Sequence, residues 1–422
     1  MKVLFITHYF APDSGAAANR LTRLARLLAQ RGHDVTVLTT LPHYPTGIVP
    51  DAYRGRLSIT ETIDGVRVIQ VWLWTTTSKA VSRRLLSQLS FMVTCILRGL
   101  FVQRPDAIFI ENQPIFTGLA GWVISRIKRR GYVLNISDYW PEYLVVAGVV
   151  SERSLVYRLF RRLAILTQQS AAHIVAMWDG LVDGVHQRIA DPPPVHLVYN
   201  AVDLDRFQPQ HDDNDAEAFR QQYNLGQQRL VTFLGVLGGH IDLDTMLAVA
   251  RHFGERDDVR FLFVGTGAQQ STLTEALAQP AFDHCHYIEW IDHGQVPAFW
   301  AASYITYWAM HDNELDKLRF QAKLYESLAS GTPAVVAVEG LQSRILAESE
   351  GGITVKPYDT RALIEAIEHL LDDDDQHQQM SQHARAYARQ HFDPAHVTDR
   401  YEALLHATAD GISPLMPEDD PA

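Results

Sequence analysis

The sequence predicts an α/β protein built from two Rossmann-like domains, each a parallel sheet covered by helices. Short apolar runs alternate with helical patterns twice along the chain, from residue 2 to about 176 and from about 230 to 338. The length of 422 residues also exceeds what one hydrophobic core usually serves. A DPPP run at 191–194 marks the approach to the boundary between them.

In the first half, residues 2–7 predict a buried strand, 16–30 an amphipathic helix closed by Gly32, and 35–38 the next strand. This βαβ opening predicts a parallel sheet. Further strands are predicted at 66–71, 107–110, 132–136 and 174–176. We expect the first domain to cover 1–197, with a C-terminal helix at about 394–412 packing back on it.

The second half repeats the pattern over 198–393. Strands are predicted at 231–235 and 261–264, and a helix at 244–252. The segment FQAKLYESLASGTPAVVA, residues 320–337, predicts a short helix, a stop at Gly331 and a buried strand. The tail 413–422 is rich in proline and acid, so we expect it to be disordered.

The charge of the chain is unevenly distributed. Up to Asn200 there are 22 basic and 13 acidic residues, a net charge of +9, and the remainder carries −21. Basic clusters lie at 83–84, 126–130 and 153–162. A positive half could attract an anionic membrane or a phosphorylated acceptor, or the clusters could be solvated helix faces. No basic tail or aromatic motif supports a polynucleotide partner.

Cysteine usage and the apolar segments bear on the compartment. Only Cys95 and Cys285 are present, far apart, which indicates a reducing environment rather than a disulfide framework. The N-terminus predicts a strand, not a signal peptide. Residues 82–101 are strongly apolar but interrupted by Arg98, so they predict either a core helix or an interfacial helix with some membrane contact. We expect a cytoplasmic protein, peripheral on the inner face of the membrane.

A cation and a carboxylate occur together in the 320–337 segment. Lys323 and Glu326 are three residues apart and share a helical face, while Leu324 points to the core. An ammonium suits a phosphate, and a carboxylate can accept hydrogen bonds from vicinal ribose hydroxyls. The pattern therefore favours a nucleotide-sugar site, although an ordinary surface ion pair would look the same.

Glycine loops follow the first strand of each half. Gly15 precedes the first helix, and Gly238, Gly239 and His240 follow the strand at 231–235. Such loops allow backbone N–H groups to approach a pyrophosphate. Neither loop is a GxGxxG fingerprint, which argues against a nicotinamide or flavin dinucleotide.

Candidate acids follow the strand at 132–136. Asp138 lies at its carboxyl end, with Glu142 as a nearby competitor, and an N-capping role is the alternative. His284, Cys285 and His286 lack a further ligand pair at metal-binding spacing, so we predict no metal site.

Together these stretches resemble the family 4 retaining glycosyltransferases of the GT-B fold, in which two Rossmann-like domains face a central cleft. The carrying motifs are the opening strand, glycine loop and RGHDVTVLTT, then VYNAVDLDRF, FLFVGTGAQQ and FQAKLYESLASGTPAVVA. LPHYPTG, DGVRVIQVW and SDYWPEY are similar to a bacterial surface-polysaccharide, fucosamine-transferase-like branch.

The resemblance implies roles for particular residues. Asp138, Lys323 and Glu326 would be catalytic, with Lys323 on the donor phosphates and Glu326 on the ribose. The implied donor-binding set is Gly15, Gly238, Gly239, His240, Gly265, Gly267, Lys323, Leu324 and Glu326. His43, Tyr44 and Glu142 would contact the acceptor. No metal and no cofactor is expected, because the nucleotide-sugar is a substrate.

The chain departs from the family pattern at several positions. Ser137 occupies the place of a frequent catalytic histidine, and Leu318 that of the first acid in E-x7-E. Val236 stands where an arginine is usual, and Glu314 is a possible substitute for the missing acid. These departures lie in the parts of the family pattern that imply the phosphate clamp and the sugar contacts.

The resemblance implies transfer of a sugar from a nucleotide donor, commonly UDP-linked, to a lipid-linked or glycan acceptor in bacterial surface polysaccharide synthesis. One alternative is a GT-B sugar-nucleotide epimerase, for which Asp138, Glu142 and Glu111 supply carboxylates. A second alternative is a catalytically silent, sugar-nucleotide-binding scaffold subunit.

Overall fold

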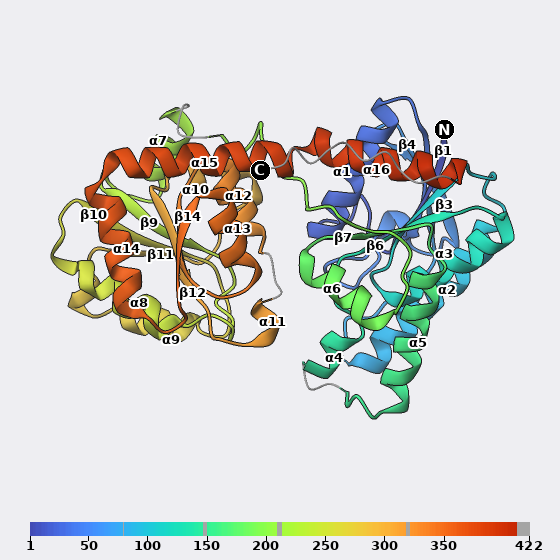
Figure 1. Cartoon of the computed structure of the whole chain (residues 1–422), viewed down its shortest axis with the longest axis horizontal. Coiled ribbons are helices and arrows are strands. Elements are labelled where there is room, and N and C mark those ends of the chain that lie inside the picture. The colour runs from blue at the N-terminus through green and yellow to red at the C-terminus, as the bar shows by residue number, and fades with distance from the viewer. Residues whose placement is uncertain (79, 147–149, 209–212, 318–320, 412–422) are drawn as a thin grey trace. The chain divides into compact units, whose positions relative to one another are not determined.

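The chain folds into two compact units. The computed structural model describes residues 1–422 except 79, 147–149, 209–212, 318–320 and 412–422, so the predicted disordered tail lies outside the described residues. Unit 1 comprises Met1–Asn200 with Ala395–Ala422, and unit 2 comprises Ala201–Pro394. Each unit is a twisted sheet with helices on both faces, as predicted for an α/β fold (Figure 1).

Unit 1 contains an eight-stranded sheet in the order β3-β4-β2-β1-β5-β6-β7-β8. The strands are β1 (Lys2–Ile6), β2 (Asp34–Thr40), β3 (Ser58–Ile63), β4 (Val66–Val71), β5 (Ala107–Glu111), β6 (Tyr132–Ile136), β7 (His173–Ala176) and β8 (Val195–Leu197). The helices are α1 (Ala16–Gln30), α2 (Val81–Gly99), α3 (Ile115–Lys128), α4 (Glu142–Val146), α5 (Leu155–Gln169), α6 (Asp179–Arg188) and α16 (Pro394–Asp410). β1 and β5 are nearly all apolar because helices cover both faces of the sheet centre.

The expectation of a purely parallel sheet is wrong at one edge. β3 pairs antiparallel with β4, whereas the other pairs of this sheet are parallel. The two strands are joined by Asp64 and Gly65, which both have positive φ angles, 50° and 81°. An Asp-Gly pair between two strands is a strong hairpin signal, so the sequence contained the information.

Unit 2 contains a six-stranded parallel sheet in the order β11-β10-β9-β12-β13-β14. The strands are β9 (Arg229–Leu234), β10 (Val259–Val264), β11 (Cys285–Ile288), β12 (Ile305–Ala309), β13 (Ala334–Ala337) and β14 (Gly352–Val355). The helices are α7 (Asp213–Gln222), α8 (Leu243–His252), α9 (Gln270–Leu277), α10 (Val296–Ala302), α11 (Glu314–Lys317), α12 (Ala322–Ser330), α13 (Leu341–Ser349), α14 (Thr360–Asp372) and α15 (Asp374–Phe392). α12 ends where predicted, at Gly331, whose φ of 66° is left-handed.

Helix α16 packs on unit 1 through polar as well as apolar contacts. Its Glu402 accepts from Arg31 at 2.6 Å and lies 2.7 Å from the Nε2 atom of His33. Tyr401, which is 4% exposed, donates at 2.7 Å to the Oδ1 atom of Asn135 in β6. The last helix of the chain is thereby joined to the centre of the unit 1 sheet.

Among the described residues, no helix combines the length and the apolar character that crossing a bilayer requires. Helix α2, the predicted core or interfacial helix, buries Ser87, Phe91, Cys95 and Gly99 along one side only.

We predict that Tyr401→Phe destabilises the protein. The substitution removes the hydroxyl that donates to the Asn135 oxygen in a buried hydrogen bond, which costs about 1–3 kcal/mol. Tyr387→Phe is the matched control, because that hydroxyl makes an exposed hydrogen bond to Glu348. Urea unfolding of both variants measures the difference, and equal stabilities would contradict the role given to Tyr401.

Candidate functional site

The glycine loops of unit 2 are held by contacts between two backbones. A Cβ atom on Gly265 would lie 1.8 Å from the carbonyl oxygen of Gly235, and the φ of Gly265 is 143°. Neither a side chain nor an ordinary backbone conformation is compatible with that position. The loops that follow β9 and β10 therefore pack directly on each other because of Gly265.

The segment around Gly238 is fixed from outside. The side chain of Gln269 donates to the carbonyl oxygens of Gly238 at 2.7 Å and Ile241 at 2.9 Å. A Cβ on Gly239 would meet nothing within 4 Å, so this part of the loop is open. Gln269 was not predicted from the sequence, because a lone glutamine after the GTG turn carries no recognisable signal.

Lys323 is buried at the start of α12, beside these loops. It is 6% exposed, and its Nζ atom lies 4.5 Å from the centre of the Phe233 ring and 4.3 Å from that of Trp308. Nζ is also 3.6 Å from where a Cβ on Gly235 would be. Burial lowers the pKa of Lys323 to about 7, because the ammonium has lost water. The site thus offers a desolvated cation at a glycine loop.

Glu326 lies one turn further along α12 and is also perturbed. Burial raises the pKa of its carboxyl to about 7, although the hydrogen bond from Trp300 and the charge of Arg206 act in the opposite direction. The Trp300 Nε1 atom donates to Glu326 at 3.1 Å. Lys323 and Glu326 therefore share a helix but have different surroundings, unlike an ordinary surface ion pair.

Leu324 has a packing role. Its side chain is fully buried, and its N–H donates to the carbonyl oxygen of Gln321 at 3.0 Å. This position in the implied donor-binding set offers a ligand neither its side chain nor that N–H. Glu314, the possible substitute acid, pairs with Lys317 at 3.1 Å.

In unit 1 the carboxyl ends of β5 and β6 hold a buried carboxylate. Glu111 is 1% exposed and accepts from Arg20 at 2.8 Å, Asn135 at 2.8 Å and Ser137 at 2.7 Å. Burial opposes the charge on Arg20, but the Glu111 carboxylate outweighs it, so the pKa of Arg20 is raised. Ser137 thus helps to hold the Glu111 carboxylate, and this hydrogen-bond network was not predicted from the sequence.

Asp138 follows this network and is exposed. Its charge contributes to the raised pKa of Arg20, so the two side chains are near one another. Glu142 is engaged differently, because both of its oxygens pair with Arg188, which also lies over the ring of Tyr139. Asp138 is the more accessible of the two predicted acids.

A second cluster gathers at the ends of β1 and β2. The Asp13 carboxylate accepts from the N–H groups of His43 at 2.8 Å and Tyr44 at 2.9 Å. His43 stacks with Tyr9 and meets His8 edge-on. A Cβ on Gly15 would lie 2.8 Å from the Tyr44 ring, so Gly15 leaves room for that ring.

Burial controls the protonation of this cluster. Loss of water lowers the pKa of His8 well below its ordinary value and lowers that of His43, even though Asp13 favours the charged form of His43. The Nδ1 atom of His8 is buried without a hydrogen-bond partner among the described residues. His43 and Tyr44 were predicted as site residues, whereas His8 was not, although its position soon after the first strand is a signal for a site residue.

A cavity of about 520 Å³ lies beside this cluster. Its lining includes the aromatic side chains of Tyr53, Trp72 and Trp74 and the cations Arg54 and Arg83. Trp72 is 38% exposed. Indole rings and guanidinium groups together suit a sugar that carries a negative charge.

His284 and His286, which were considered as metal ligands, contact backbone carbonyl oxygens. His284 contacts the carbonyl oxygen of Ala250 at 2.8 Å, and His286 that of Asn224 at 3.2 Å. In the described part of the chain, one group of three could hold an ion: His33, Glu402 and His406. There Glu402 already binds Arg31, so a cation would compete with a guanidinium.

Family comparisons match both halves of the chain. Residues 15–201 match a glycosyl transferase 4-like domain, and residues 215–387 match glycosyl transferases group 1. A protein named as a colanic acid biosynthesis glycosyl transferase, WcaI of Escherichia coli (strain K12), is 23% identical over 385 residues, covering 88% of this chain and 92% of that protein. A protein named as a probable glycosyltransferase, WbjE of Pseudomonas aeruginosa, is 26% identical over 249 residues. The matched region covers 57% of this chain and 60% of WbjE.

Solved structures show the same fold. Anabaena HepE in complex with UDP has a TM-score of 0.70 at 16% identity, with 96% of this chain and 100% of that chain covered. Sucrose-phosphate synthase from Thermosynechococcus elongatus has a TM-score of 0.69 at 16% identity, with 97% and 99% covered. None of these comparisons favours an epimerase or a silent subunit. The chain is a glycosyltransferase of the GT-B fold, with a glycosyl transferase 4-like domain followed by a glycosyl transferases group 1 domain.

Proposed function

We propose that this enzyme transfers a sugar, with retention of anomeric configuration, from a UDP-sugar to a lipid-linked or glycan acceptor in bacterial surface polysaccharide synthesis. The observation that carries the proposal is Lys323, a buried cation beside open glycine loops, with Glu326 on the same helix. The HepE structures with UDP and UDP-glucose and the name of WcaI support the donor and the pathway class. The fucosamine-transferase-like branch remains our narrower prediction.

In this mechanism the two phosphates of the donor supply the negative charge that balances the ammonium of Lys323. Lys323 and the amides near Gly239 stabilise the departing UDP, each by about 2–4 kcal/mol, in place of a divalent metal. Glu326 accepts from the ribose hydroxyls. The bond from the anomeric carbon to the phosphate oxygen breaks, and the acceptor hydroxyl forms the new bond on the same face.

The acceptor side of the proposal rests on unit 1. Asp138 is exposed and close to Arg20, where its carboxylate can accept the proton that the acceptor hydroxyl loses. The cavity lined by Trp72, Trp74 and Arg83 suits an acceptor sugar next to a phosphate. A lipid-linked acceptor requires the protein to work at a membrane, and we propose a peripheral position on the cytoplasmic face.

Glu326→Ala should weaken UDP binding about ten- to a hundredfold, because a hydrogen bond to a charged group contributes about 1.5–3 kcal/mol. Thermal shift with UDP, GDP, ADP and their sugars measures it, since a hundredfold excess over Kd stabilises by about 2.7 kcal/mol. The matched ligand is 2′,3′-dideoxy-UDP, which should bind both proteins equally weakly. Unchanged UDP affinity in the variant would remove Glu326 from the ribose site, and no shift with any nucleotide would refute a nucleotide-sugar donor.

The low pKa of Lys323 predicts pH-dependent binding. Above pH 7, Lys323 of the unliganded protein is mostly the neutral amine, so binding of a diphosphate requires the uptake of one proton. The affinity should therefore fall by up to about tenfold per pH unit as the pH rises. Glu326 titrates over the same range with the opposite effect, so the measurement is made in Glu326→Gln. Calorimetry in buffers of different ionisation enthalpy reports the proton.

Lys323→Arg in the same background provides the control, because arginine stays charged throughout this range. Proton uptake should disappear in that double variant. If the pH slope persists in it, the titrating group is not Lys323.

Asp138→Asn should lower turnover by about two to four orders of magnitude, the usual contribution of an acid–base group, while UDP affinity is unchanged. Product formation and nucleotide thermal shift are compared on the same preparation. Full turnover in the variant would exclude a catalytic role for Asp138.

A further inference from the structure

Helix α2 exposes a continuous apolar stripe. Leu86, Leu89, Val93, Leu97 and Leu100 recur at spacings of three and four residues and are 51%, 40%, 48%, 56% and 41% exposed. This spacing places them along one side of the helix, opposite the buried side that carries Phe91 and Cys95. Folding of unit 1 buries only one of the two apolar sides of α2.

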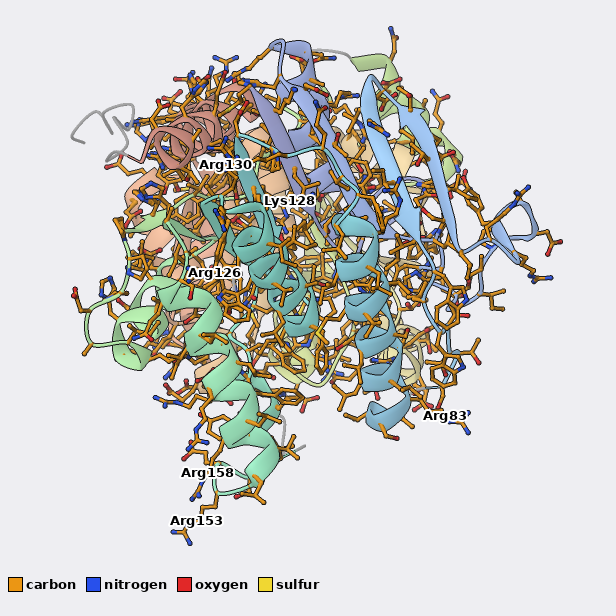
Figure 2. The ribbon with its side chains drawn as sticks, turned by 90° about the vertical axis from the view of Figure 1, so that its right-hand side faces the viewer. Arg83, Arg126, Lys128, Arg130, Arg153 and Arg158 are labelled. Atoms are coloured by element: carbon orange, nitrogen blue, oxygen red, sulfur yellow. The ribbon has the colours of Figure 1, made fainter. Side chains whose placement is uncertain are left out.

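Helix α5 repeats this arrangement nearby. Leu155, Val156, Leu159 and Leu166 are 80%, 47%, 55% and 36% exposed. Helix α3 packs against both α2 and α5, and the three helices run side by side on one face of unit 1 (Figure 2). Ile127, near the end of α3, is 50% exposed. We call the outward side of these three helices the α2–α5 face.

The charged residues within α2, α3 and α5 have one sign, although Glu152, just before α5, is an exposed acid. The three helices contain eight basic residues and no acidic residue. Arg83 lies at the N-terminal end of α2, and Arg153 and Arg158 lie at that of α5, whereas Arg126 and Lys128 lie towards the other end of α3 (Figure 2). Cations therefore border the apolar stripes at both ends.

We propose that the α2–α5 face is a membrane-binding surface that lies in the headgroup region of an anionic bilayer. Aliphatic side chains enter the acyl boundary while arginines meet lipid phosphates, as in interfacial amphipathic helices. A second copy of the chain fits less well, because a two-fold contact would bring two sets of helices together whose charged residues are all basic. The inference rests on the proposed lipid-linked acceptor and names the surface that reaches it.

Arg83 connects this face with the acceptor cavity. It lies in the first turn of α2 and also lines the cavity, together with Trp72 and Trp74. A lipid-linked diphosphate lying at the headgroup level would thus meet a guanidinium at the edge of the cavity. The membrane surface and the acceptor cavity share a border within unit 1.

Flotation of the full-length protein with vesicles tests the proposal. The wild-type protein should bind vesicles of phosphatidylcholine and phosphatidylglycerol, and this binding should weaken at high salt. It should bind vesicles of phosphatidylcholine alone much less. The combined variant Leu89→Gln, Val93→Gln and Leu97→Gln should reduce binding about tenfold or more, because three aliphatic groups are lost. Arg158→Gln with Arg162→Gln should remove most of the preference for anionic lipid.

The controls are exposed residues elsewhere: Leu57→Gln, at a residue that is 79% exposed, and Arg361→Gln in α14 of unit 2. Both should bind vesicles like wild type. Equal binding by all variants would overturn the proposal, as would no binding by wild type. A dimer in lipid-free solution that the triple variant abolishes would also overturn it and identify a second copy as the occupant.

The same variants separate this inference from the proposed function. Nucleotide thermal shift and transfer to a water-soluble acceptor analogue should be unchanged in the triple variant, because its three positions lie outside the nucleotide loops and the cavity lining. Lost vesicle binding with normal transfer supports the surface. Normal vesicle binding without any transfer would refute the function and leave the surface standing.

Discussion

The chemistry of unit 2 depends on one buried cation whose charge the fold does not favour. Lys323 is surrounded by the rings of Phe233 and Trp308 and by the glycine loop at Gly235. Aromatic faces attract an ammonium but replace only part of its hydration. A phosphate bound there would restore the balance, so the free energy lost in burying the cation is recovered only when an anion arrives. The backbone contact at Gly265 keeps the loops close enough for this to happen.

In unit 1, by contrast, the buried charge of Glu111 is compensated by neighbouring side chains. Glu111 is satisfied by Arg20, Asn135 and Ser137, so its carboxylate is compensated within the fold. A group so thoroughly hydrogen-bonded is held in place, which suits a support for the ends of β5 and β6. The carboxylate of Asp138, which follows this support, is exposed to solvent and therefore accessible to a substrate. Ser137 belongs to the support, because its hydroxyl donates to Glu111.

Local patterns predicted the elements, and distant contacts decided the sites. β4 and β6 lie at the predicted residues, because short apolar runs bounded by turn residues suffice to define buried strands. Lys323 and Glu326 were predicted as site residues from their spacing, and both lie in α12. Their perturbed pKa values were not predictable, since Phe233, Trp308 and Trp300 come from other elements. The antiparallel β3 was missed although Asp64-Gly65 signals its hairpin.

The overall charge of the chain would argue against an anionic membrane partner, since it is −12. Electrostatic interactions are screened over about 8 Å at physiological ionic strength, however, so a lipid headgroup responds to nearby charges rather than to the sum. On α2, α3 and α5 those nearby charges are all positive. Because the apolar stripes of the same helices are also exposed, attraction and insertion act at one surface. The uneven division of charge, +9 up to Asn200 and −21 after it, therefore has a local meaning that the net value conceals.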